Sequence, residues 1–185
     1  MLPRGSRIRP ATGYVRELAM NLYTPERLQG AIFLDVCAGS GLVGFEALSR
    51  GAARTIFIEA DRRTSGLLRD CAESFGVSSR VTIINLDARR CFATLRNALG
   101  GRCIDAAFLD PPYITGMAVD LLYRFGAAAD IFAANGLLVL RTPEQLPQEV
   151  PGLQFVEKRP AGNGALWLYY PARIDHSQQE GCGGG

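Results

Sequence analysis

The sequence contains no apolar run long enough to cross a membrane, and it has only one histidine. No hydrophobic stretch approaches the roughly 20 residues of a membrane-spanning helix, and the N-terminus, Met-Leu-Pro-Arg-Gly, lacks the apolar core of a signal peptide. The single histidine, His176, lies in a polar segment, and the five cysteines form no Cys-x-x-Cys pair. We interpret the cysteines as reduced core residues. These absences predict a cytoplasmic protein without a metal site.

The chain also has few lysines and a small net charge. Of the 20 basic residues only Lys158 is a lysine, and a net charge of +2 is too small to establish a nucleic-acid partner. The distribution is more informative, because four arginines precede or adjoin the first acid of the chain, Glu17. Arginine suits phosphate contacts. The four are Arg4, Arg7, Arg9 and Arg16.

The length and composition fit one domain. A chain of 185 residues at 48% hydrophobic can build a full core but is too short for two comfortable domains. We expect one domain at 1–173, with a basic arm at 1–11, and a disordered tail at 174–185. Apolar runs alternate with helical patterns, which predicts a parallel, doubly wound α/β sheet. Strands are expected at 31–36, 54–59, 81–86, 104–109 and 136–141, and helices at 12–24, 42–51, 61–75, 88–99 and within 117–133.

The last third changes pattern. Two β-rich runs, 153–159 and 165–170, flank a Gly-Asn-Gly turn at 162–164. This pattern predicts a hairpin that ends the sheet with an antiparallel strand.

A stiff tetrapeptide, Asp110-Pro111-Pro112-Tyr113, directly follows the apolar strand expected at 104–109. Ligands of open α/β sheets lie at the carboxyl ends of the strands, and the two prolines fix an extended backbone there. Neither proline has an N–H, so the local acceptors are the Asp110 carboxylate and the Pro111 carbonyl. A flat amino group could lie between them, with Tyr113 stacked on its ring. The simpler alternative is a double proline that merely ends a strand.

This elbow resembles the motif of methyltransferases that use S-adenosylmethionine to modify exocyclic amino groups of nucleic-acid bases. The glycine loop bears on that resemblance, because Gly39, Gly41 and Gly44 also have the G-x-G-x-x-G spacing of dinucleotide sites. Asp35, just before them, would repel a pyrophosphate and attract the ammonium and sulfonium of S-adenosylmethionine. We therefore expect the sulfonium cofactor, and segment 35–41 resembles the first motif of that class.

Further cofactor contacts are expected at the strand ends. Glu59 is placed to accept the ribose hydroxyls, with Asp61 as the alternative, and Asp87 with the Ala88 N–H is placed to hold the adenine. Each acid alone could instead stabilise a helix N-terminus. Four acids at four successive strand ends nevertheless favour a cofactor site. The predicted cofactor-binding residues are Asp35, Ala38, Gly39, Ser40, Gly41, Glu59, Ala60, Asp87, Ala88 and Asp110, and the predicted catalytic residues are Asp110, Pro111, Pro112 and Tyr113.

The segment before the glycine loop narrows the resemblance. Arg9, Pro10, Val15, Arg16 and Glu17 match the Arg-Pro-Thr-x-x-x-Val-Arg-Glu segment of the RsmD family. That family methylates N2 of a guanine in bacterial small-subunit (16S) ribosomal RNA. The resemblance implies a Rossmann-like class I methyltransferase fold. Such a fold is a mostly parallel, seven-stranded sheet with helices on both faces and an antiparallel C-terminal hairpin.

The resemblance covers about residues 3–170 and has departures. Ala11 and then Thr12 follow the proline where the family usually has threonine directly, and Tyr14 stands where a second arginine is common. The family's glycine- and arginine-rich N-terminal hairpin has room here for only a few residues. We therefore expect the arginines at 4, 7, 9 and 16 to bind the RNA backbone. For Arg16, an acid partner or the cofactor carboxylate is the alternative.

The implied reaction needs no strong base. The guanine leaves its stack, its N2 donates to Asp110 and the Pro111 carbonyl, and Tyr113 stacks on the purine. After methyl transfer, Asp110 or water takes the proton. The expected partner is ribosomal RNA in a partly assembled small subunit, and we expect a monomer without metal or membrane contact. The alternatives are a DNA adenine or other base amino-methyltransferase and a non-catalytic, dinucleotide-binding domain.

Overall fold

The computed structural model describes residues 13–172. The arm expected at 1–11, the proposed helix cap Thr12 and the tail at 174–185 lie outside the described residues. The α-helices are α1 (Gly13–Met20), α2 (Pro25–Leu28), α3 (Leu42–Ser49), α4 (Arg62–Ser74), α5 (Phe92–Leu99) and α6 (Met117–Ala127). The 3-10 turns are η1 (Ser78–Arg80), η2 (Ala88–Arg90) and η3 (Ala129–Ile131). The strands are β1 (Ile32–Val36), β2 (Arg54–Ile58), β3 (Val81–Ile84), β4 (Ile104–Leu109), β5 (Phe132–Thr142), β6 (Glu149–Val150), β7 (Leu153–Ala161) and β8 (Gly164–Pro171).

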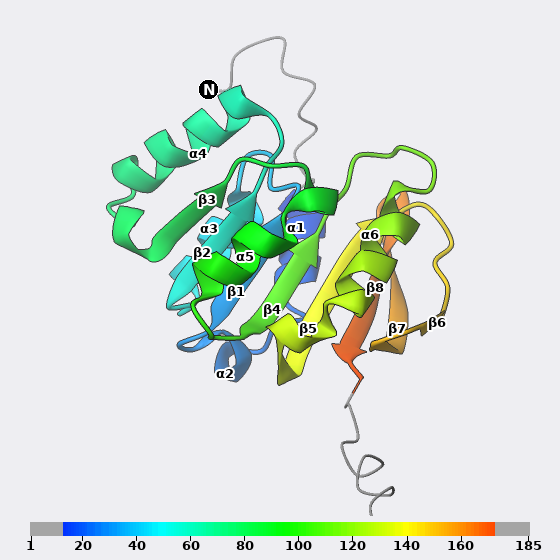
Figure 1. Cartoon of the computed structure of the whole chain (residues 1–185). Helices are drawn as coiled ribbons and strands as arrows, with labels where there is room; N and C mark the ends of the chain where they lie inside the picture. The colour runs from blue at the N-terminus through cyan, green and yellow to red at the C-terminus, as the bar shows by residue number, and fades with distance from the viewer. Residues whose placement is uncertain (1–12, 173–185) are drawn as a thin grey trace, which may run out of the picture.

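The strands form one mixed sheet in the order β3-β2-β1-β4-β5-β8-β7-β6 (Figure 1). Strands β1 to β5 pair in parallel, whereas β8 pairs antiparallel with both β5 and β7. The predicted doubly wound sheet with an antiparallel C-terminal hairpin is confirmed. The predicted count of seven strands is wrong, because β6 adds an eighth, which pairs with the start of β7. Two residues carry no period-2 pattern, so the sequence does not indicate this strand.

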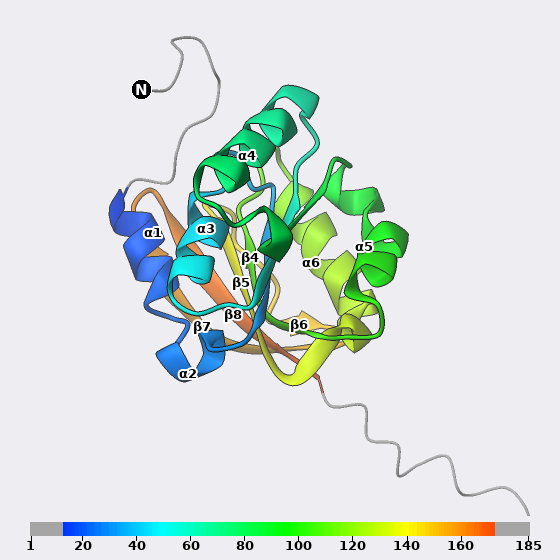
Figure 2. The same ribbon diagram turned by 90° about the vertical axis from the view of Figure 1, so that its left-hand side faces the viewer.

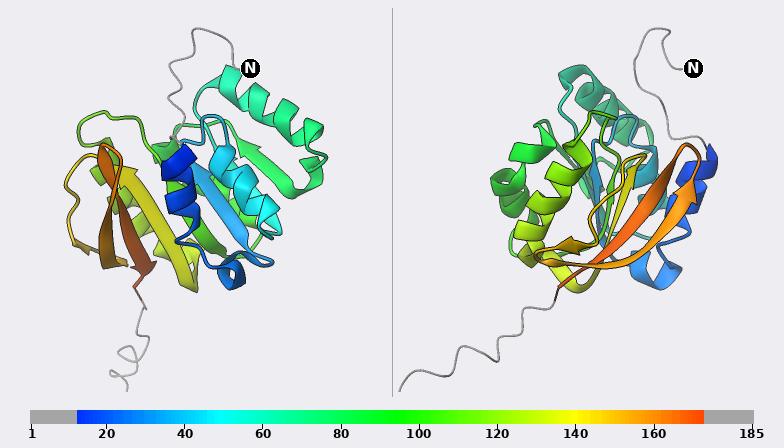
Figure 3. Two further views of the ribbon diagram at one scale, coloured as in Figure 1. Left: turned by 180° about the vertical axis from the view of Figure 1, so that it is seen from behind. Right: turned by 90° about the vertical axis from the view of Figure 1, so that its right-hand side faces the viewer.

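Helices cover both faces of the sheet. Figure 2 shows α1 and α3 on one side of the sheet and α5 and α6 on the other. Strand β1 is buried throughout and feeds both cores: Phe33 packs on the α1 and α3 side, and Ile32 and Leu34 pack on the α5 and α6 side. Seen from the hairpin side in Figure 3, β7 and β8 continue the sheet past β5, and β8 is still buried along most of its length. Burial on both faces explains the continuous apolar runs in the sequence.

Several element boundaries differ from the prediction. The first helix ends at Met20, and Pro25 begins the separate helix α2 because proline is favoured at the first helical position. Thr24 caps α2, since its hydroxyl accepts the Arg27 N–H at 3.3 Å. The helix expected at 88–99 is divided into η2 and α5, and β5 begins earlier than expected, at Phe132.

The close approach of α3 to the sheet depends on Gly44. A Cβ atom at this position would lie 2.3 Å from Cε1 of Phe57 on β2. The Gly44 carbonyl accepts the Thr55 hydroxyl at 3.1 Å, which ties the helix to the same strand. The third glycine of the motif thus lets α3 pack on the sheet and fixes its N-terminus above β1.

Candidate active site

Four acids gather at one edge of the sheet, where the parallel strands β1 to β4 end. They are Asp35 on β1 and, after the next three strands, Glu59, Asp87 and Asp110. All four carboxylates lie close enough to the thiol of Cys37 to affect its pKa. Burial is the main reason that the pKa of Cys37 rises to about 12, and all four carboxylates add to it. The structure therefore brings together the four acids that the sequence singled out.

The loop between β1 and α3 makes a tight turn at this edge. Gly39 and Gly41 have φ angles of 53° and 70°, in the left-handed region that favours glycine. A Cβ atom on Gly41 would also lie 2.4 Å from Cδ2 of Leu68. Cys37 has a φ angle of 59° without being glycine, which costs on the order of 1 to 3 kcal/mol and is typical of functional loops.

Asp35 is the most deeply buried of these acids, with 2% of its surface exposed. Its Oδ2 accepts the Gly44 N–H at 2.9 Å, so it binds the first turn of α3. The pKa of Asp35 rises to about 8, mainly because the carboxyl is buried. The Gly44 N–H lowers this pKa, and the carboxylates of Asp110 and Glu59 raise it. A cation placed beside Asp35 would relieve this cost of ionisation.

Glu59 supports the glycine loop from the next strand. Its Oε2 accepts the Gly39 N–H at 2.9 Å, and its Oε1 accepts the Asp61 N–H at 2.8 Å. Asp61 itself caps α4, because its Oδ1 accepts the Thr64 N–H at 2.7 Å, and these bonds lower the pKa of Asp61. The structure thus gives Asp61 the helix-capping alternative and leaves Glu59 as the acid nearest the loop.

These contacts distinguish between the two possible cofactors. The Gly39 and Gly44 amides, which a pyrophosphate would use as donors, are already bonded by Glu59 and Asp35. The loop therefore offers acidic oxygens rather than free amides. Such an edge suits a cationic ligand with hydroxyl groups, as the sequence predicted.

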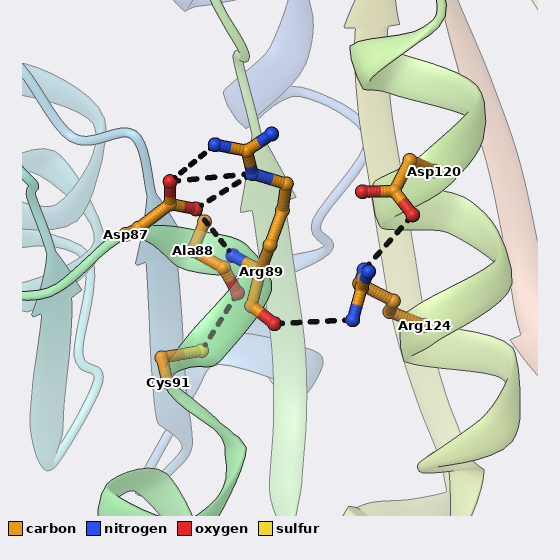
Figure 4. Close-up of polar contacts among 6 residues, drawn as sticks. All are labelled: Asp87, Ala88, Arg89, Cys91, Asp120 and Arg124. Carbon is orange, nitrogen blue, oxygen red and sulfur yellow. Dashed lines mark hydrogen bonds and ion pairs between the residues drawn. The ribbon is translucent and has the colours of Figure 1, made fainter.

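Asp87 has a partner that the sequence analysis missed. Arg89 folds over the Asp87 carboxylate, with Nη2 at 2.5 Å from Oδ2, and its backbone N–H donates to Oδ1 at 2.8 Å (Figure 4). The arginine side chain is the main reason that the pKa of Asp87 falls to about 2. Ala88, the other predicted adenine contact, is buried in η2. Its carbonyl accepts the Cys91 thiol at 3.1 Å.

The proline elbow follows β4 and presents its acceptors at the same edge. Asp110 is anchored by its own N–H, which donates to the Val36 carbonyl at 3.2 Å. Pro111 is buried and Tyr113 is 48% exposed. Within residues 13–172, no donor bonds the Pro111 carbonyl. The elbow therefore has a carboxylate, an available carbonyl and an accessible aromatic ring close together in the chain.

Arg141 is the main site residue that the sequence analysis missed. Strands β4 and β5 pair Leu109 with Leu140, so the next residues, Asp110 and Arg141, lie side by side at the edge. Nη1 of Arg141 lies 3.2 Å from Oδ2 and 3.3 Å from Oδ1 of Asp110. Burial raises the pKa of Asp110, and Arg141 opposes that rise. The sequence does show an arginine at the end of an apolar strand. It does not show that Asp110 is its neighbour, because that depends on the register between β4 and β5.

The four arginines predicted to bind RNA are only partly covered by the structure. Arg4, Arg7 and Arg9 lie outside the described residues. Arg16 lies on α1 and lines a groove of about 360 Å³, together with Arg80, Phe45 and Phe75. Phe75 is 61% exposed. The groove thus combines two arginines with aromatic and aliphatic side chains, and Glu46 also lines it.

Two negative findings complete the description of residues 13–172. In this range no three histidine, cysteine, aspartate or glutamate side chains are grouped as metal ligands. None of the helices described is both long enough and apolar enough to span a membrane.

Comparison with known proteins identifies the family. Residues 1–170 match the family model described as "Conserved hypothetical protein 95". The chain belongs to this family. It is 34% identical over 168 residues to "Putative rRNA methyltransferase YlbH" of Bacillus subtilis (strain 168), covering 89% of both chains. It is 30% identical over 148 residues to "Ribosomal RNA small subunit methyltransferase D" of Haemophilus influenzae, covering 78% of this chain and 72% of that one.

A solved structure gives the same relationship. "Putative methyltransferase yhhF from Escherichia coli" superposes with a TM-score of 0.73 at 30% identity, covering 92% of this chain and 90% of that chain. The family is thus one of class I methyltransferases, whose methyl donor is S-adenosylmethionine. The acidic edge fits this donor, because the carboxylates of Asp35 and Glu59 beside the glycine loop offer acceptors to its ammonium and hydroxyl groups.

Proposed function

We propose that this protein methylates the exocyclic N2 amine of a guanine in small-subunit ribosomal RNA. The observation that carries the proposal is the elbow, in which Asp110, the available Pro111 carbonyl and the half-exposed Tyr113 adjoin the acidic edge. Arg141 donates to both oxygens of Asp110, but each oxygen keeps a second lone pair that can accept from an amine. An accessible aromatic ring suits a flipped base. The names of the relatives above support RNA as the nucleic acid.

In this proposal each residue of the acidic edge binds a different part of the cofactor. Asp35 faces the ammonium, Glu59 accepts from the ribose hydroxyls, and Asp87 with the Ala88 N–H holds the adenine. Ala38, Ser40 and Gly41 of the loop and Ala60 after β2 supply backbone surface next to these groups. When bound, S-adenosylmethionine supplies an electrophilic methyl group.

The elbow residues hold the base. Asp110 and the Pro111 carbonyl accept the two N2 hydrogens, Pro112 keeps the backbone extended, and Tyr113 stacks on the purine. This arrangement points the nitrogen lone pair towards the cofactor side of the site. Positioning of this kind can lower the activation barrier by roughly 7 to 11 kcal/mol. The amine becomes acidic only after it is methylated, so the carboxylate of Asp110 or water receives its proton.

In this proposal the RNA backbone is held by the basic residues that precede α1 in the chain and by Arg16 on α1. Arg4, Arg7 and Arg9 precede α1 in the chain, and Arg16 lines the groove on that helix. We propose ribosomal RNA in a partly assembled small subunit as the partner, a cytoplasmic location and a monomeric enzyme.

The test uses small-subunit RNA and partly assembled subunits from a strain that lacks the gene. Purified protein is incubated with methyl-labelled S-adenosylmethionine, and the labelled nucleoside is identified after digestion. The proposal expects N2-methylguanosine at one position. Label in N6-methyladenosine or in DNA alone would favour the other base amino-methyltransferases that share the elbow. Binding of a nicotinamide dinucleotide, without binding of S-adenosylhomocysteine, would overturn the proposal.

A further inference from the structure

Arg141 contacts two residues of the elbow. Its guanidinium lies 3.2 Å from the Asp110 carboxylate, and its Cζ atom lies 5.7 Å from the centroid of the Tyr113 ring. A cation over an aromatic face at this distance is attracted to it. One side chain from β5 thus links the acceptor and the stacking ring, which are separated by two prolines in the chain.

The contact is more protected than the other ion pairs described in residues 13–172. The Arg141 and Asp110 side chains are 11% and 23% exposed, whereas the partners in the remaining pairs are 32% to 55% exposed. The Nε of Arg141 is buried and has no hydrogen-bond partner in this range. An unpaired buried donor is unfavourable, so the arginine is held here by its contacts with the elbow.

Apart from Arg141, the surroundings of Asp110 disfavour its charged form. Burial raises the pKa of Asp110, and its carboxylate in turn adds to the raised pKa values of Asp35 on β1 and Cys37 after β1. Arg141 on β5 is the cation that opposes these effects within the described residues. Nη1 binds both oxygens of Asp110, yet each oxygen keeps a second lone pair for a further N–H.

We propose that Arg141 is a positioning residue for methyl transfer: it holds Asp110 as a charged acceptor at a fixed place beside the Tyr113 ring. The inference rests on the proposed function for its catalytic consequence. Its physical core, the coupling of Arg141 to Asp110, is a property of the free protein. Arg141 contacts neither base nor cofactor in this role, and it acts through Asp110 and Tyr113.

The first experiment tests the coupling without any substrate. The carboxyl carbon of Asp110 is followed by NMR as a function of pH in the wild type, Arg141→Met and Arg141→Lys. Loss of the neighbouring cation should raise the pKa of Asp110 by about one unit or more, because an adjacent arginine commonly lowers a carboxyl pKa by about 1 to 3 units. Lysine should restore part of the difference. Arg124→Met, which removes an exposed arginine paired with Asp120, is the matched control and should leave Asp110 unchanged.

The second experiment measures methyl transfer against pH. For Arg141→Met we expect kcat to fall at least tenfold at pH 7, the acid limb of the profile to move to higher pH, and the KM for S-adenosylmethionine to stay within about twofold. Arg141→Lys should recover both rate and profile in part. Arg141→Gln serves if the methionine variant does not fold.

The two experiments separate the possible failures. An Asp110 titration that is identical in wild type and variants would overturn the inference, whatever the protein methylates. A shifted titration with an unchanged rate profile would overturn the positioning role. A wild-type protein that methylates no guanine would refute the proposed function, while the titration would still decide the coupling.

Discussion

Asp35 has a buried carboxylate whose proton links the site to the stability of the fold. With a pKa of about 8 in the folded state and 3.8 as the ordinary value, the folded protein holds a proton that the unfolded chain has lost between these limits. The stabilisation from this proton is complete below about pH 4 and is lost as the pH rises to about 8. A site that needs the charge of Asp35 therefore costs stability near neutral pH.

Asp35→Asn should make this cost visible. Because asparagine does not titrate, we expect the free energy of unfolding of the variant to rise relative to that of the wild type from pH 5 to pH 8, by at most about 1.4 kcal/mol per pH unit. Urea unfolding at several pH values measures the difference. Asp130→Asn is the control, because Arg96 lowers the pKa of that exposed carboxyl, so it does not titrate in this window. A difference independent of pH would contradict the burial argument.

Asp110→Ala tests the elbow itself. The substitution removes a charged acceptor for the target amine, so we expect the transition state to lose on the order of 2 to 4 kcal/mol. Calorimetry should give an affinity for S-adenosylmethionine close to that of the wild type, since the carboxylate faces the base in the proposed complex. Asp120→Ala, on the exposed face of α6, should retain full activity. Near wild-type turnover in Asp110→Ala would mean that the elbow does not hold the amine.

At the residue scale, the sequence indicated the acids better than their partners. Asp35, Glu59 and Asp110 could be predicted because each follows or ends a recognisable apolar strand, and parallel strands bring such ends to one edge. Arg141 could not, because its contact with Asp110 depends on the register between β4 and β5. The pairing of Arg89 with Asp87 depends on side-chain conformation, which no periodicity indicates.

At the element scale, the position of α3 depends on how closely a helix can approach a strand. Gly44 and Gly66 are both helical glycines, on α3 and α4, and their surroundings are opposite. A Cβ atom on Gly44 would meet three side-chain atoms of Phe57 and Thr55 at 2.3 to 2.8 Å, whereas one on Gly66 would meet nothing within 4 Å. The same substitution at these two positions should therefore have opposite effects.

Gly44→Ala should lower the free energy of unfolding by about 1 to 3 kcal/mol, because α3 must shift from the sheet to admit the methyl group. The shift should also weaken cofactor binding, since the Gly44 N–H holds Asp35. Gly66→Ala should instead raise stability by about 0.5 to 1 kcal/mol through helix propensity. Chemical unfolding of both variants measures the contrast. Equal effects at the two sites would show that close packing does not constrain α3.

Elements with strong patterns were predicted, and those set by single contacts were not. The β1 strand, the glycine loop and α3 follow from an apolar run, three glycines and a helical stripe. Helix α2 is four residues long and depends on the Thr24 cap, and β6 exists only through its pairing with β7. Short elements lack enough residues for a period, so tertiary contacts decide them.

At the scale of the whole molecule, the small net charge conceals an uneven distribution. Acids gather at the ends of β1 to β4, where Asp35, Glu59 and Asp110 suit a cationic cofactor. The groove between Arg16 of α1 and the side chains of α3 carries Arg16 and Arg80 beside the exposed Phe75. In the proposed function the acidic edge repels the phosphates of RNA, so basic residues outside this edge are needed to bring a base to the elbow.

This division predicts which arginines govern RNA affinity. Each lost phosphate contact should reduce the slope of log affinity against log salt concentration by roughly 0.7 to 0.9. We expect such a reduction in Arg4→Ala/Arg7→Ala and in Arg9→Ala, and a separate one in Arg16→Ala if its groove holds the backbone. A salt titration of RNA binding measures the slopes, with Arg159→Ala as the control because that arginine pairs with Glu157 on the hairpin.

Slopes equal to the wild type in the arm variants and in Arg16→Ala would exclude these four arginines as the RNA surface. A reduction in Arg16→Ala alone would assign RNA binding to the groove, and a reduction in the arm variants alone would leave Arg16 to pair with an acid or to contact the cofactor.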